Sequence, residues 1–84
     1  MKNRLVMFES IHHALHAEKV LKVAGVDFEL IPTPREISSS CGQSIALAAK
    51  DMEKALKDMS QEKVEYRGIF SADFRQRIYE RLPS

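Results

Sequence analysis

The 84 residues of this chain, 44% of them apolar, are enough for one small domain with one compact core. The 13 basic and 12 acidic side chains nearly balance, which argues against a nucleic-acid partner, because phosphates select a basic face. No apolar run approaches the roughly 20 residues of a membrane span, and we recognise no leader at the start of the chain. A single cysteine excludes a secreted module held by disulfides, so we expect a single cytoplasmic domain over residues 1–84.

The first third of the chain predicts a strand, a helix and a second strand. Residues 4–9 centre on a short continuous apolar run, which is typical of a buried strand. Ser10 offers an N-cap hydroxyl and Gly25 a C-terminal stop, so a helix is expected between them. Its apolar stripe consists of Ile11, Ala14, Ala17, Leu21 and Ala24. Residues 26–31 alternate apolar and charged side chains and predict a half-buried strand, which Pro32 and Pro34 end.

The rest of the chain contains one ambiguous segment. Residues 35–42 are polar and hydroxyl-rich and are interpreted as a surface loop. Residues 43–50 fit either a strand or the first half of a long helix, and we favour a strand followed by a helix from Asp51. A strand interrupted at Gly68 is predicted over residues 65–72. Phe74, Ile78 and Leu82 recur every four residues, which predicts a short amphipathic C-terminal helix.

The expected order is therefore β-α-β-β-α-β followed by a short helix. It belongs to the α+β class and to the split βαβ pattern of a ferredoxin-like sandwich, in which two helices cover one face of an antiparallel sheet. In that topology the first strand ends beside the start of the third. We therefore expect Cys41, just before the third strand, to lie near Glu9 and Ser10, with His13 in the first turn of the following helix.

Cys41 is the candidate reactive residue, because a thiolate held at the rim of a domain is a nucleophile. A helix N-terminus carries partial positive charge and unpaired N–H donors, and both favour an anion. Lone cysteines are often buried core residues, but the Ser-rich and Gly flanks favour a functional role here. The candidate binding residues around Cys41 are Arg35, Ser38, Ser39, Ser40, Gly42, Ser10 and His13.

Residues 34–42, Pro-Arg-Glu-Ile-Ser-Ser-Ser-Cys-Gly, carry a resemblance to a known family. Together with residues 8–10, 13–14, 17–19 and 24–25, they resemble the selenium/sulfur carrier-like family, whose members are small proteins or domains of about this length. The resemblance implies that Cys41 carries sulfur or selenium. The chain would then be a carrier or accessory protein without a cofactor, loaded by a cysteine desulfurase or a selenium-delivery enzyme and unloaded by an unidentified acceptor.

Two other function classes stay open at this point. A metal chaperone would use Cys41 with His12 and His16, which are four residues apart on one helix face. Zinc usually takes three or four protein ligands, and because a further ligand cannot be named, no metal site is predicted. A ferredoxin-like ligand-binding or regulatory module would use the sheet edge and a homodimer interface. The apolar stripe of Phe74, Ile78 and Leu82 either packs on the open face of the sheet or forms a homodimer contact. Arg35 either pairs with Glu36 or holds an anionic group.

Overall fold

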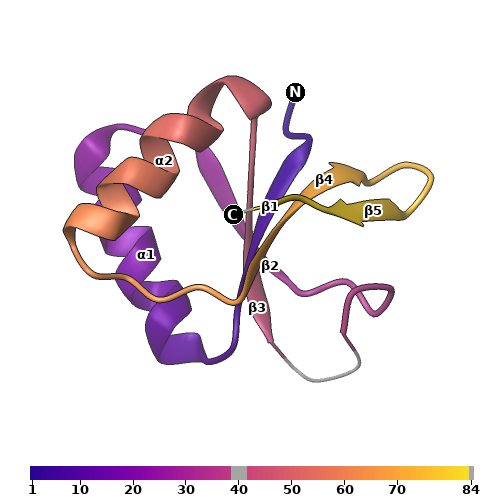
Figure 1. The fold of residues 1–84 in the computed structure, drawn as a ribbon, viewed down its shortest axis with the longest axis horizontal. Coiled ribbons are helices and arrows are strands. Elements are labelled where there is room, and N and C mark those ends of the chain that lie inside the picture. The colour runs from indigo at the N-terminus through magenta and orange to yellow at the C-terminus, as the bar shows by residue number, and fades with distance from the viewer. Residues whose placement is uncertain (39–41, 84) are drawn as a thin grey trace.

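The computed structural model describes residues 1–38 and 42–83, which form one antiparallel sheet and two helices (Figure 1). The strands are β1 (Arg4–Phe8), β2 (Phe28–Pro32), β3 (Gln43–Leu47), β4 (Gly68–Asp73) and β5 (Ile78–Arg81). The helices are α1 (Ile11–Ala24) and α2 (Ala49–Gln61), and both lie on the same side of the sheet. The predicted α+β class is confirmed, and the first six elements follow the expected order.

The strands of the sheet lie in the order β2-β3-β1-β4-β5, and every neighbouring pair is antiparallel. The central strand β1 pairs Phe8 with Gln43 of β3 and Met7 with Gly68 of β4. The end of β1 therefore lies between the beginnings of β3 and β4. This junction places the residues that follow β1 beside those that precede β3.

Helix α1 begins and ends where the sequence predicts. The Ser10 hydroxyl accepts a hydrogen bond from the His13 N–H at 3.4 Å, as an N-cap does. Gly25 adopts the left-handed conformation, with φ of 76°, and its N–H donates to the carbonyls of Leu21 and Lys22. Ile11 is 47% exposed, so the first residue of the predicted apolar stripe is not buried.

The ambiguous segment after Gly42 is a strand, β3, which confirms the interpretation that we favour. Four consecutive residues, 44–47, are buried, because β3 is an inner strand with both faces covered. Helix α2 begins at Ala49, slightly before the predicted Asp51. Its Ala48 N-cap has no side-chain hydrogen bond, and the Asn3 side chain instead accepts from the Ala49 N–H at 2.9 Å.

Two apolar clusters fill the two faces of the sheet. The larger lies between the sheet and the helices and includes Val6, Phe8, Ile45, Leu47, Ile69, Ala14, Ala17, Leu21, Met52, Ala55 and Met59. The smaller, on the other face, contains Leu5, Met7, Phe70 and Ala72. The residues packed against it come from the β2–β3 loop and the β4–β5 hairpin as well as from β2: Ile31, Ile37, Phe74 and Tyr79.

The predicted C-terminal helix is wrong, because β4 and β5 form a hairpin there (Figure 1). The Asp73 carboxylate accepts a hydrogen bond from the Gln76 N–H at 3.1 Å, and Arg77 has a positive φ of 59°, so the chain reverses. In β5, Tyr79 packs on the smaller cluster while its neighbour Ile78 is 51% exposed, because adjacent strand residues point to opposite faces. With this fifth strand, the structure does not match the ferredoxin-like pattern exactly.

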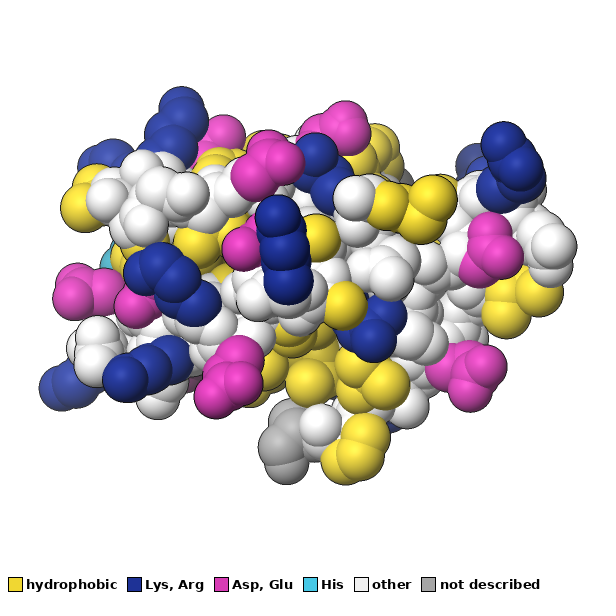
Figure 2. Space-filling model, turned by 90° about the horizontal axis from the view of Figure 1, so that it is seen from above, with side chains coloured by type: hydrophobic (Ala, Val, Ile, Leu, Met, Phe, Trp, Pro, Cys, Tyr) yellow, Lys and Arg dark blue, Asp and Glu magenta, His cyan; other side chains and the backbone are white. Residues whose placement is uncertain are grey.

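The molecular surface carries charges of both signs. On the face shown in Figure 2, basic and acidic side chains are interspersed, with apolar side chains between them. Within residues 1–38 and 42–83, neither helix is long and apolar enough to cross a membrane.

Candidate functional site

The chain segments on either side of Cys41 meet the sheet at the end of β1. Thr33, which follows β2, donates its backbone N–H to the Gly42 carbonyl at 3.0 Å. A Cβ atom added to Gly42 would lie 3.1 Å from the Phe8 carbonyl oxygen and 3.2 Å from the Thr33 hydroxyl oxygen. Gly42 therefore lies in close contact with the last residue of β1, where a larger side chain would be crowded.

A small pocket of about 120 Å³ opens at this junction. Its lining residues are Met7, Phe8, Glu9, Thr33, Ser38, Gly42 and Arg67. Ser38 and Gly42 are the described residues immediately before and after residues 39–41, so the chain leaves and rejoins the described structure at this pocket. The volume equals that of about four water molecules and is sufficient for a small anion.

Arg67 supplies a positive charge to the lining of this pocket. Its guanidinium Nη1 lies 3.1 Å from a Glu9 carboxylate oxygen, and its backbone N–H donates to the Met7 carbonyl at 2.7 Å. Both side chains are well exposed, at 60% and 70%. Because exposed ion pairs contribute little free energy, Arg67 can turn from Glu9 to another anion at small cost.

Sequence reasoning missed Arg67. It lies far from residues 34–42 along the chain, and only the pairing of β4 with β1 brings it to the pocket. In the sequence, Arg67 falls within the strand predicted over residues 65–72, directly before Gly68, where β4 begins. That position does not reveal a neighbour until the strand order is known.

The start of α1 forms the neighbouring surface. The Ser10 hydroxyl caps the helix, and His13 Nε2 lies 3.5 Å from a Glu65 carboxylate oxygen. A hollow of about 450 Å³ lies here, lined by Glu9, His13, Val64, Glu65, Tyr66 and Arg67. Glu9 and Arg67 therefore belong to both surfaces, whereas His13 lines only the hollow.

An ion pair fastens the β2–β3 loop to the β4–β5 hairpin. Arg77 donates from Nε at 2.5 Å and from Nη2 at 3.0 Å to the two carboxylate oxygens of Glu36. These hydrogen bonds hold the pKa of Glu36 below its usual value. Glu36 therefore pairs with Arg77, which is 41 positions away in the chain. The alternative in which Arg35 pairs with Glu36 is wrong.

The same loop is anchored by an apolar side chain and by backbone hydrogen bonds. Ile37 packs against the smaller core cluster, and the N–H groups of Ile37 and Ser38 both donate to the Pro34 carbonyl. Beneath the loop, the hydroxyl oxygens of Thr33 and Ser44 lie 2.7 Å apart in a buried hydrogen bond. Both hydrogen bonds and an apolar contact therefore hold the chain before residue 39 in place.

Of the predicted site residues, Ser38 and Gly42 share the pocket, and Ser10 and His13 lie at the adjacent start of α1. Arg35 is exposed and does not line the pocket. Cys41, with Ser39 and Ser40, lies outside the described residues, and its proximity to Glu9 and Ser10 stays a prediction. Within the described ranges, no three His, Cys, Asp or Glu side chains are grouped to hold a metal ion, and His12 and His16 are exposed on α1.

The comparison with protein families matches residues 3–71 to the family described as "Putative Se/S carrier protein-like". The match covers most of the chain, and the chain belongs to this family. The resemblance stated from the sequence is therefore confirmed. Comparisons with curated proteins and with solved structures gave no match.

Proposed function

We propose that this protein carries sulfur or selenium on the thiol of Cys41. The observation that carries the proposal is that the chain's only cysteine lies within the residues that match the carrier family. The described residues on either side of residues 39–41 add support, because Ser38 and Gly42 both line a pocket that also holds Arg67.

The transfer step exchanges one sulfur–sulfur bond for another. The Cys41 thiolate attacks the outer sulfur of a persulfide on a donor enzyme, and the bond between the two donor sulfurs breaks. Its electron pair leaves on the donor's cysteine thiolate, so the products are a Cys41 persulfide and the regenerated donor thiolate. No external oxidant or reductant is consumed. Selenium transfer follows the same balance with a selenopersulfide, and a thiolate acceptor unloads the carrier by the same reaction.

A single cysteine suits this chemistry. A second nearby thiol in the same chain would attack the persulfide and release hydrogen sulfide, which would lose the cargo. Both the attacking thiolate and the loaded persulfide are anions, and a nearby guanidinium stabilises anions. Arg67, which forms an exposed pair with Glu9, is the cation among the described residues that line the pocket beside Gly42.

The partners follow from the reaction class. The donor is an enzyme that forms a persulfide or selenopersulfide on its own cysteine, as a cysteine desulfurase or a selenium-delivery enzyme does. The acceptor is a protein or small molecule with a thiolate that removes the outer atom. Such a carrier works in the cytoplasm, where thiols are kept reduced.

The proposal is tested by loading the purified protein with a cysteine desulfurase and cysteine and measuring its intact mass. The wild type is expected to gain one sulfur atom, and the gain is expected to disappear after treatment with a reducing thiol. The Cys41→Ser variant is expected to gain none.

A matched control moves the thiol to another exposed position. Ser60 lies near the end of α2 and is exposed, so Cys41→Ser/Ser60→Cys keeps one accessible cysteine away from the pocket. This variant is expected to load far more slowly than the wild type. Equal loading of the two proteins, or no loading of the wild type, would contradict the proposal.

A further inference from the structure

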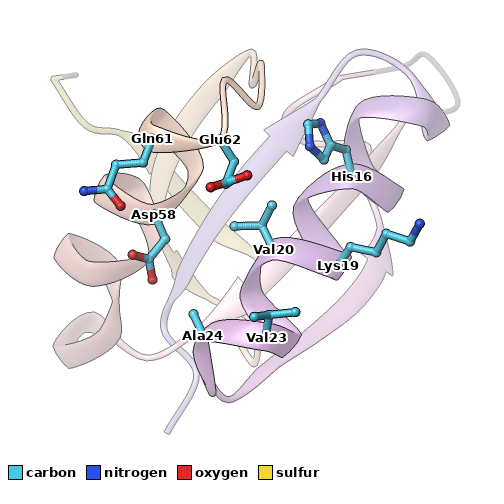
Figure 3. A pocket seen from close by; sticks show the side chains of 8 residues that line it. All are labelled: His16, Lys19, Val20, Val23, Ala24, Asp58, Gln61 and Glu62. Atoms are coloured by element: carbon cyan, nitrogen blue, oxygen red, sulfur yellow. The ribbon is translucent and has the colours of Figure 1, made fainter.

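We infer that the groove between α1 and α2 is the contact surface between two copies of this chain. The groove has a volume of about 420 Å³ and lies on the helical layer of the protein. Figure 3 shows Val20 extending from α1 toward α2, with Asp58 and Glu62 on the opposite wall. The inference is independent of the proposed sulfur transfer.

Apolar side chains line the α1 side of the groove. Val23 is 91% exposed, and Val20 and Ala24, which pack against the larger core cluster, keep part of their surface open on the same side of the helix. Single exposed apolar residues are common on protein surfaces, whereas a contiguous set at the side of a groove is typical of a contact site. Covering these side chains removes apolar surface from water and favours association.

The two walls of the groove differ in charge. The α1 wall contributes Lys19 and His16, and the α2 side contributes Asp58 and Glu62. Asp58 pairs with Lys54 on its own helix at 3.1 Å. Lys19 and Glu62 form no ion pair with any other residue that the structure describes. The groove therefore presents the ammonium group of Lys19 on its α1 side and the carboxylate of Glu62 on its α2 side.

This charge arrangement is complementary to itself. A two-fold axis along the groove would lay α1 of one copy over α2 of the second copy, as an isologous dimer requires. Lys19 of each copy would then face Glu62 of the other, and Val23 of both copies would be covered. A net charge of +1 per chain gives little repulsion between copies.

The same features favour a second copy over a foreign helix. A foreign helix would have to supply both charge signs and an apolar stripe in matching order, whereas the chain's own surface already has them. None of the residues that line the groove lines the pocket beside Gly42. Both copies would therefore keep that pocket outside the contact.

The experiment is sedimentation equilibrium of the full chain over a range of protein concentrations. The wild type is expected to associate to a dimer. Val23→Asp, Lys19→Glu and Glu62→Lys are each expected to raise the dimer dissociation constant by about tenfold or more, because symmetry repeats every change twice. Lys22→Glu is the control, since Lys22 lies on α1 outside the groove lining, and it is expected to leave the dissociation constant unchanged.

Mixing two variants tests the pairing itself. Lys19→Glu and Glu62→Lys chains are each mismatched with themselves, but together they restore two opposite-charge contacts, so an equimolar mixture is expected to form heterodimers. A wild type that stays monomeric at all concentrations overturns the inference. It is also overturned if Val23→Asp and Lys19→Glu dimerise like the wild type, or if the mixture fails to recover association. Circular dichroism of each variant verifies the fold.

Discussion

The buried hydroxyl pair beneath the β2–β3 loop offers a sharp test of how the site is supported. Thr33 and Ser44 lie 2.7 Å apart, and Ser44 is completely buried. In Ser44→Ala the Thr33 hydroxyl loses its partner in a place that water scarcely reaches. Leaving a buried polar group unsatisfied costs about 1–3 kcal/mol, so we expect the free energy of unfolding to fall by about 2 kcal/mol. For a domain of this size that loss lowers the melting temperature by roughly 10 °C.

The assay is equilibrium urea unfolding of a double-mutant cycle. Thr33→Val keeps the side-chain shape and is expected to cost a similar amount, because it leaves Ser44 without its partner. In the double variant neither hydroxyl remains, so its loss is expected to be about 1 kcal/mol smaller than the sum of the single losses. Ser60→Ala, an exposed change of the same chemical type, serves as the control and is expected to change stability by less than about 0.5 kcal/mol. Additive losses, or single losses no larger than that of the control, would refute the reasoning.

Three further changes test the anchoring of the loop and the core. Arg77→Gln is expected to raise the pKa of Glu36 toward its usual value, because the guanidinium hydrogen bonds lower it. The wild type is therefore expected to exceed this variant in stability by a constant amount at pH values above the ordinary glutamate pKa. This difference is expected to decrease as the pH falls through the lowered pKa of Glu36. A side-chain NMR titration that gives the same Glu36 pKa in both proteins would contradict this expectation. Gly42→Ala is expected to cost about 1–3 kcal/mol, since its Cβ would press on the Phe8 carbonyl oxygen, and an unchanged urea midpoint would exclude the close contact. Leu21→Ala, at a fully buried position, is expected to cost about 2–5 kcal/mol by urea unfolding, and a loss below about 1 kcal/mol would mean that the α1 core is packed differently.

Local sequence signals predicted the order of the first six elements, although β4 begins at Gly68 and not at the predicted residue 65. Ser10 and Gly25 act through their own backbone neighbourhood, so the ends of α1 could be located without knowledge of the rest of the fold. The segment after Gly42 could be assigned as a strand because its apolar run is short, and burial on both faces explains its lack of alternation. These features depend on interactions over a few residues.

The main error in the predicted fold is the C-terminal helix. Phe74, Ile78 and Leu82 have helical spacing, but the Asp73 side chain and the positive φ of Arg77 turn the chain into a hairpin instead. The spacing was a coincidence, since Leu82 packs on one core cluster and Phe74 on the other.

The candidate site depends on contacts between distant parts of the chain. Its motif residues could be singled out from residues 34–42, but the cation that lines the pocket could not. Arg67 reaches the pocket through β-sheet pairing, and Glu36 finds Arg77 through the hairpin. Both relations require the strand order, which local patterns do not specify.

The hydrogen bond from Thr33 to Gly42 extends the β2–β3 pairing one step beyond Pro32 and Gln43, so the sheet itself closes the loop of residues 34–41. Loop-closure entropy grows slowly, at about 0.6 kcal/mol for each doubling of length. Additional residues in this connection would therefore cost little closure entropy while Thr33 and Gly42 stay paired. The length of the connection and the stability of the sheet are thus separable, which makes this small protein a practical scaffold for inserting other sequences between these two residues.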